Sequence, residues 1–244
     1  MVENVNYLAL RAQQSLDRRL ASAANNLANA GVNGFKADDV RFQALSQRPA
    51  RAAERPRDIV FVRDAGLVRD FSQGALQKTN EPFDVALDGD GFFVVQGDTG
   101  PLYTRDGAFR LNAEGGLVTR EGRAVLNEQN QPIVFDPRGE QPEIDAQGRI
   151  RVGAAQIGAL QVASFANPAQ LAKLGDNLFD AGRTPALPSQ ARVVQGAIEN
   201  SNVRPIIEIT EIIQISRAYQ GAAQIVADTD NLRRTALERL SGLA

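Results

Sequence analysis

Four aspartates are the clustered side chains in this sequence that could do acid–base chemistry: Asp84, Asp88, Asp90 and Asp106. Two carboxylates that flank a glycosidic bond can act as general acid and as base or nucleophile. The chain contains no His and no Cys, which excludes serine–histidine and cysteine–histidine nucleophile systems as well as His/Cys zinc sites. The enzymatic alternative that the composition leaves open is therefore a carboxylate-dependent glycan hydrolase.

The glycines beside these aspartates favour a simpler interpretation. Asp88, Asp90 and Asp106 each directly precede a glycine, and Asp favours turns because its carboxylate accepts hydrogen bonds from nearby backbone N–H groups. The Asp-Gly-Asp-Gly run lacks the spacing and the terminal Glu of an EF-hand loop, and it leads into a strand rather than into a phosphate-binding helix. We therefore interpret these aspartates as turn residues, and we expect no catalytic residue, no metal ligand and no cofactor.

A β-rich centre is predicted around these turns. From residue 81 onward, short runs of Val, Phe and Leu alternate with turn dipeptides at intervals typical of hairpins. Asn167 and Pro168 are typical of an N-cap and a first helical position, which predicts one short helix that reaches Leu174 before Gly175. We expect residues 81–184 to form a compact, mostly antiparallel β domain with a core of its own.

Residues 201–240 predict a long helix around which the rest of the chain is organised. Pro205 stands where a first helical position would be, and no proline follows it, so one helix can continue almost to the end of the sequence. Apolar residues recur at every third or fourth position, with Asp230 and Arg233 as interruptions. From this stripe we expect four residues in a subunit interface: Ile209, Ile212, Tyr219 and Val226.

A second amphipathic helix is predicted at the other end of the chain, over residues 6–30. Its apolar positions are again spaced by threes and fours, and most of them are Ala, which permits close approach of another helix. The large members, Leu16, Leu20 and Leu27, are expected in the subunit interface. We expect Gly31 to take the left-handed conformation behind the helix, and Asn33-Gly34 predicts a turn.

Together these elements predict an α+β fold in three parts. Each terminal helix is marginal alone, because the entropy lost on ordering its backbone offsets what its apolar stripe gains on burial. We therefore expect the helices of residues 1–31 and 201–244 to pair as a coiled-coil-like layer. Residues 32–80 and 185–200 are expected as an extended connector to the β domain of residues 81–184. The simpler alternative is an ordinary helical hairpin packed on the chain's own core.

Charge and hydropathy exclude several function classes. The 244 residues carry a formal net charge of −2, which provides no general attraction to nucleic acid. No apolar run is long enough to span a membrane, and the first residues lack the pattern of a secretory signal. The Arg-rich segment 47–57 has interleaved acidic residues and no aromatic residue. A solvated connector is therefore favoured there over a nucleic-acid-binding patch.

Motifs in four regions of the chain resemble signatures of the bacterial flagellar rod, hook and hook-associated axial proteins. The N-terminal one is ANNLAN at 24–29 with GFK at 34–36, and the central ones are FDVAL at 83–87 with GDGFF at 89–93 and YTR at 103–105 with GAF at 107–109. The C-terminal ones are NSNV at 200–203 and RAYQ at 217–220. The motif positions that we expect to matter most are Asn25, Asn26, Asn29, Gly34, Phe35, Gly89, Gly91, Phe92 and Asn202. Within the family, the tract at 61–74 and the ending at 231–234 resemble the proximal-rod members most, with the distal-rod members as the alternative.

The resemblance implies a structural subunit rather than an enzyme. In this family the terminal helices form the inner layer of a helical tube, the β domain lies outside it, and the rod transmits torque from motor to hook. Implied partners are copies of the chain itself, other proximal-rod and distal-rod subunits, membrane-ring or bushing proteins, and the flagellar type III export apparatus. Nucleic acid and small-molecule substrates are not implied.

The implied place is the basal body, crossing the periplasm, after export without a cleaved signal peptide. A soluble adaptor that uses its helices to bind one partner is the alternative from the class of binding proteins.

Overall fold

The computed structural model describes residues 2–47, 59–136 and 139–241, which divide into two compact units. The helical unit combines residues 1–28, 38–69 and 204–244, and the β unit combines residues 29–37 and 70–203. Residues 48–57 of the Arg-rich segment lie outside the described residues. In the part of the chain that is described, neither helix has the length and apolar character needed to cross a membrane.

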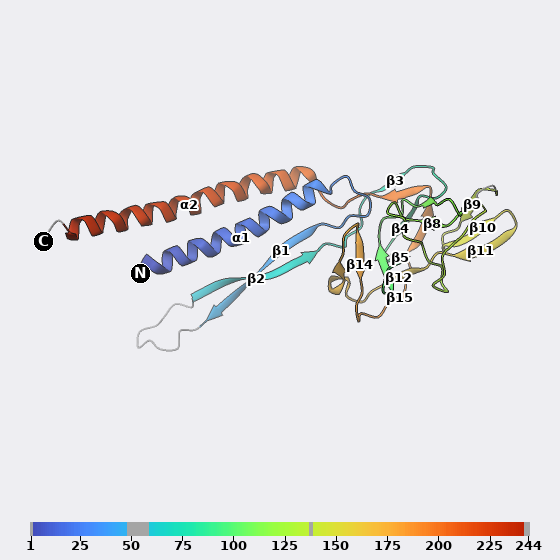
Figure 1. The fold of residues 1–244 in the computed structure, drawn as a ribbon, viewed down its shortest axis with the longest axis horizontal. Helices are drawn as coiled ribbons and strands as arrows, with labels where there is room; N and C mark the ends of the chain where they lie inside the picture. Colours follow the sequence, from blue (N-terminus) through green and yellow to red (C-terminus); the bar gives the residue numbers. More distant parts are fainter. Residues whose placement is uncertain (1, 48–58, 137–138, 242–244) are drawn as a thin grey trace. The chain divides into compact units, whose positions relative to one another are not determined.

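Two long helices form most of the helical unit. Helix α1 spans Val2–Ala28, and helix α2 spans Pro205–Ser241. They lie side by side and run in opposite directions (Figure 1). Pro205 is the first residue of α2, as predicted, because a first helical position needs no backbone N–H donor. Glu208 in the first turn and Arg239 in the last turn complement the helix dipole.

A long β-hairpin completes the helical unit, where the sequence predicts an extended connector. Strand β1, Asp38–Gln47, pairs antiparallel with strand β2, Ile59–Arg69, and β1 contacts α1. The register shifts by one residue between Val40, opposite Leu67, and Phe42, opposite Asp64. A bulge of this kind lets one strand continue through an extra residue. This bulge explains how β2 continues through Asp64-Ala65-Gly66, a sequence whose composition is typical of a turn.

The β unit consists of short antiparallel strands. Its largest sheet has six strands in the order β13-β14-β6-β5-β12-β15, and a second sheet has the order β11-β10-β9. The pairs β16-β4, β17-β3 and β7-β8 are added to these. Every strand pair in the described residues is antiparallel. The strands are β3 Leu76–Lys78, β4 Val85–Asp88, β5 Phe92–Gln96, β6 Pro101–Thr104, β7 Arg110–Leu111, β8 Leu117–Val118, β9 Pro142–Ile144, β10 Arg149–Val152, β11 Ala155–Ala159, β12 Val162–Ser164, β13 Ala172–Lys173, β14 Leu178–Asp180, β15 Leu187–Pro188, β16 Arg192–Gln195 and β17 Ala197–Glu199.

Segments that the sequence assigns to the connector also contribute strands to this unit. Strand β3, from the N-terminal side, pairs with β17, and β16 pairs with β4 in the domain centre. Two apolar clusters form the core, one around Phe93 and Ile150 and one around Phe92 and Phe179. The β unit therefore reaches beyond residues 81–184, because its two ends are paired with each other and with its centre.

The turns and caps follow the prediction in part. The side chain of Asn167 accepts a hydrogen bond from the N–H of Ala169, and Pro168 is the first helical residue, as predicted. The helix is a single 3-10 turn, Pro168–Gln170, because the chain then enters strand β13. The left-handed residue after α1 is Gly34, with φ +66°, and not Gly31.

Candidate functional site

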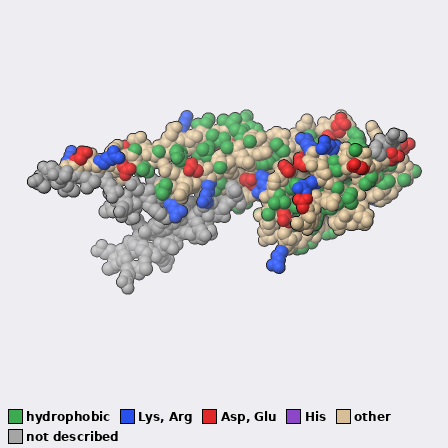
Figure 2. Space-filling view, viewed as in Figure 1, with side chains coloured by type: hydrophobic (Ala, Val, Ile, Leu, Met, Phe, Trp, Pro, Cys, Tyr) green, Lys and Arg blue, Asp and Glu red, His purple; other side chains and the backbone are tan. Residues whose placement is uncertain are grey.

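Helix α2 carries large apolar side chains that remain exposed among the described residues. Ile206, Ile209 and Ile213 share one stripe, because residues three and four apart lie on the same side of a helix. Ile206 is 80% exposed, and Leu232 further along the helix is 73% exposed. Figure 2 shows hydrophobic side chains gathered over the first half of α2. A contiguous apolar patch of this kind marks an interaction surface.

The opposite face of α2 is turned toward its own unit. Ile215 is 2% exposed and is the most buried large residue of α2, and Ala23 takes the same role in α1. The sequence prediction missed Ile215, because a step of four from Ile212 leads to Ser216 and a step of three leads to Ile215. Both steps fit a helix, and only the packed structure distinguishes between them.

The predicted interface residues differ in their exposure to solvent. Leu16, Leu20 and Leu27 on α1 are half-buried, and so are Ile212 and Val226 on α2. Ile209 and Tyr219 are exposed. The structure therefore brings five of these residues toward the interior of the helical unit and leaves two available to a neighbour.

Asn26 of α1 forms hydrogen bonds to both β1 and α2 in the helical unit. Its Nδ2 donates to the backbone oxygen of Asp38 at 2.9 Å and to Glu208 Oε1 at 3.3 Å, and its Oδ1 accepts from the N–H of Asp38 at 2.9 Å. The hydroxyl of Ser22 also donates to the oxygen of Asp38, at 2.7 Å. The amide thus pairs with the first residue of β1 as a neighbouring strand would, while it also reaches the first turn of α2.

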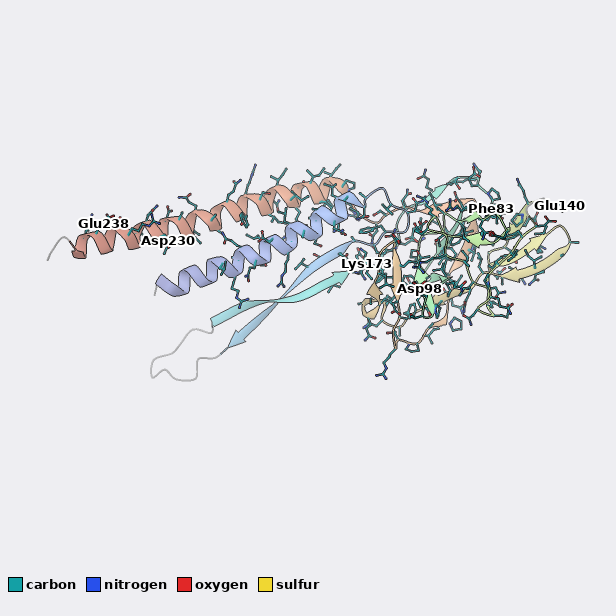
Figure 3. All side chains as sticks on the ribbon, in the orientation of Figure 1. Phe83, Asp98, Glu140, Lys173, Asp230 and Glu238 are labelled. Atoms are coloured by element: carbon teal, nitrogen blue, oxygen red, sulfur yellow. The ribbon has the colours of Figure 1, made fainter. Side chains whose placement is uncertain are left out.

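A second polar contact joins the same helices. Arg19 Nη2 lies 2.6 Å from Glu211 Oε1, and both side chains are partly exposed. Burial raises the pKa of the Glu208 carboxyl, and the hydrogen bond from Asn26 opposes that rise. The charges of Glu211 and Asp39 raise it further. Polar contacts therefore accompany the apolar ones along the α1–α2 pair. Figure 3 draws the described side chains on the ribbon.

Three charged side chains form a buried cluster inside the β unit. Glu199 Oε1 accepts from Lys36 Nζ at 2.6 Å, and Glu199 Oε2 accepts from Arg105 Nη1 at 3.1 Å. The side chains are 0%, 1% and 3% exposed for Glu199, Lys36 and Arg105. Burial lowers the pKa of Lys36 and of Arg105, and the charge of Glu199 opposes this. Glu199 thus pairs with two cations that come from distant parts of the sequence, and the charges of Asp70 and Asp90 also raise the pKa of Lys36 and of Arg105, respectively.

Backbone groups complete the cluster. Lys36 Nζ also donates to the oxygen of Ser72 at 2.7 Å, and the N–H of Gly74 donates to Glu199 Oε1 at 2.9 Å. Arg105 Nη2 donates to the oxygen of Gly89 at 2.9 Å. The sequence analysis did not single out these charged residues, although Lys36 and Arg105 lie inside the quoted motifs. A charged residue at an inward position, such as Glu199 two residues after buried Ala197, is the signal that could have revealed the cluster.

Asn202 joins two further segments next to this cluster. Its Oδ1 accepts from the N–H of Ala37 at 2.8 Å, and its Nδ2 donates to the oxygen of Asp70 at 2.8 Å and of Ser72 at 3.2 Å. The N–H of Asp70 donates directly to the oxygen of Ala37. Asn202 therefore holds together two chain segments that enter and leave the β unit.

Among the other motif residues, the two phenylalanines and Gly91 fill close-packed positions, and the two remaining asparagines do not. Phe35 and Phe92 are buried, with Lys173 Nζ 4.2 Å from the centroid of the Phe35 ring and the Arg105 guanidinium carbon 5.3 Å from that of Phe92. A Cβ on Gly91 would lie 2.6 Å from Ser189 Oγ. Asn25 is exposed and Asn29 is half-buried, and the oxygen of Asn29 accepts from the N–H of Val32.

The prediction that the aspartates are turn residues holds for Asp106, whereas Asp84 forms a β-bridge with Ala108 and Asp88 is the last residue of strand β4. Asp106 Oδ1 accepts from the N–H of Ala108 at 3.0 Å, as a turn aspartate does. Burial raises the pKa of Asp106. Within the described residues, no group of three or more acidic side chains is arranged to hold a metal ion.

Gly34 provides the first testable prediction. Its φ is +66°, and a Cβ there would lie 2.4 Å from the backbone carbon of Arg105. We expect Gly34→Ala to lower the free energy of unfolding of the β unit by about 1–3 kcal/mol, because both the conformation and the space oppose a side chain. Urea unfolding followed by circular dichroism measures this. The control is Gly100→Ala, since nothing lies within 4 Å of a Cβ at Gly100; equal stability of the two variants would contradict the prediction.

Comparison with known proteins gives consistent matches along the chain. The model of the flagellar hook protein FlgE/F/G D1 domain matches residues 86–152, and the model of the flagellar basal body rod FlgEFG protein C-terminal region matches residues 194–239. The flagellar basal-body rod protein FlgF of Caulobacter vibrioides is 39% identical over 241 residues, which cover 98% of each chain.

Other relatives carry the names of two rod proteins. FlgF of Mesorhizobium japonicum is 32% identical over 237 residues, which cover 96% of each chain. The flagellar basal-body rod protein FlgG of Agrobacterium fabrum is 32% identical over 252 residues, which cover 92% of this chain and 95% of the relative. The FlgF relatives match 96–98% of this chain and the FlgG relatives 86–92%, while the identities overlap, at 31–39% for FlgF and 30–34% for FlgG.

Proposed function

The chain belongs to the flagellar FlgE/F/G rod and hook protein family and is a structural subunit of the flagellar basal-body rod, and we propose that it occupies the proximal rod, the place of the FlgF members. The exposed isoleucine face of α2 is the observation that carries the mechanism. In an assembled rod this face is covered by neighbouring subunits, so that the terminal helices form a continuous coiled-coil-like inner layer.

The mechanism is mechanical. A face on one copy that meets a different face on the next copy, without closing a ring, generates a helical tube. Such a tube transmits torque from the motor to the hook while each subunit keeps its own β unit folded. The chain acts without catalysis, cofactor or small-molecule substrate in this role.

The proposed partners follow from the place in the rod. They are further copies of the chain, the neighbouring proximal-rod and distal-rod subunits, and membrane-ring or bushing proteins that surround the rod. Delivery by the flagellar type III export apparatus, without a cleaved signal peptide, brings the subunit across the inner membrane into the periplasm. The distal rod, the place of the FlgG members, is the alternative.

Localisation in isolated basal bodies tests the proposal. We would insert an epitope at the exposed turn of Gly153 and Ala154, between β10 and β11, in the native bacterium. Immunogold electron microscopy of purified hook–basal bodies is expected to show label at the membrane-proximal end of the rod. Label next to the hook would indicate the distal rod, and basal bodies without label from a strain that still swims would overturn the rod assignment.

A further inference from the structure

We infer that Asn26 fixes the register in which α1 pairs with α2, so that every copy of the subunit presents the same apolar face. The inference goes beyond the proposed place in the rod, because it concerns pairing within one chain. It starts from the position of Asn26, which is 4% exposed and lies near the point where α1, β1 and the start of α2 come together.

The apolar contacts alone leave the register weakly determined. The α1 stripe is mostly Ala and includes the buried Ala23, and the apolar residues on the inward side of α2 are Ile212, Ile215 and Val226 beside Ala222 and Ala223. Small and aliphatic side chains pack in several arrangements, because dispersion contacts have no direction. A slide of one helical turn, ~5.4 Å, would exchange one set of apolar contacts for a similar one.

The amide of Asn26 distinguishes between these arrangements. Its two hydrogen bonds to Asp38 hold it against β1, and its remaining N–H reaches Glu208 on the first turn of α2. A slide by one turn carries Glu208 away and leaves a buried amide donor without its acceptor, which is unfavourable. A single buried Asn sets register in coiled coils for the same reason.

A second contact supports the same register from one side of the pair. Arg19 reaches Glu211, three residues after Glu208, from a position two helical turns before Asn26. The helices are antiparallel, so a step back along α1 from Asn26 to Arg19 corresponds to a step forward along α2 from Glu208 to Glu211. One register of the two helices therefore satisfies both contacts. The isoleucine face then has a fixed position relative to the hairpin in every copy.

Cysteine scanning tests the inference cleanly, because the chain contains no Cys and every disulfide is therefore engineered. One Cys replaces Ala23, and a second is moved along α2 through positions 212, 215, 216 and 219, so that Glu208 and Glu211 stay in place. Non-reducing electrophoresis of protein from isolated basal bodies separates intramolecular disulfides from links between copies. With Asn26 present, we expect intramolecular cross-linking to peak at a single α2 position and its nearest neighbour.

The same scan in an Asn26→Leu background gives the decisive comparison. We expect cross-links at positions one turn away, and the ratio of native to shifted cross-links falls at least about fivefold. Gln14→Leu, at an exposed position of α1, is the matched control and keeps the original profile. Where Asn26→Leu does not assemble, Asn26→Ser is scanned instead, since its short hydroxyl cannot span both Asp38 and Glu208. An unchanged profile in the variant that assembles overturns the inference, and so does a broad profile in the parent.

Discussion

Replacing Glu199 by Gln is expected to lower the free energy of unfolding of the β unit by about 3–5 kcal/mol, because it leaves two buried cations without their anion. Lys36 and Arg105 both depend on this carboxylate, and all three side chains are almost fully buried. The amide of Gln keeps the shape of the side chain and one acceptor oxygen. The loss therefore reports charge rather than packing.

Lys36→Met tests whether the loss of stability comes from unpaired charge or whether any substitution in the cluster destabilises the β unit equally. It removes one of the two cations and leaves Glu199 and Arg105 as a balanced pair. We expect it to destabilise the β unit markedly less than Glu199→Gln does, although the oxygen of Ser72 loses a donor.

Urea unfolding followed by circular dichroism of the full chain measures both variants. Glu143→Gln is the matched control, since the Glu143 side chain is 77% exposed, and its effect is expected to stay within about 0.5 kcal/mol. A Glu199→Gln variant as stable as the Glu143→Gln control would show that the buried charges are not balanced by Glu199.

The sequence was sufficient for the terminal helices and for the turns of the β unit but not for this cluster. Both terminal helices follow from apolar residues at every third or fourth position, and Pro205 sets the first residue of α2. The turns of the β unit follow from Asp and Gly, as at Asp106. In the chain, Glu199 is separated by 163 positions from Lys36 and by 94 positions from Arg105. Local periodicity carries no information about contacts of that range.

The hairpin and the motif asparagines show two further limits of structure prediction from this sequence. The Asp-Ala-Gly in β2 has the composition of a turn, yet pairing with β1 carries the strand through it, because a bulge absorbs the extra residue. Asn26 and Asn202 stood out only through the family resemblance. Their function depends on backbone groups of Asp38, Ala37 and Asp70, whose positions a side-chain pattern does not encode.

The exposed face of α2 gives the second large prediction. Ile213→Asp is expected to abolish rod assembly and swimming while the isolated subunit keeps its fold. Ile213 is exposed in the single chain, so a carboxylate there costs the subunit little. Between subunits it would remove an apolar contact worth about 1.5–3 kcal/mol and bury a charge that has no partner. Each subunit of a helical tube repeats that loss, so the effect multiplies along the rod.

Two controls make the result specific to the exposed face. Ile213→Leu keeps an apolar side chain at the same exposed position and is expected to leave swimming intact. Ile212→Asp places the charge on the half-buried side and is expected to disrupt the helical unit itself, with the β unit still folded. Swimming in soft agar, electron microscopy of basal bodies and circular dichroism of the purified variants distinguish the three cases. Normal swimming with Ile213→Asp would mean that this face is not covered in the rod, and the mechanism of assembly through α2 would then be wrong.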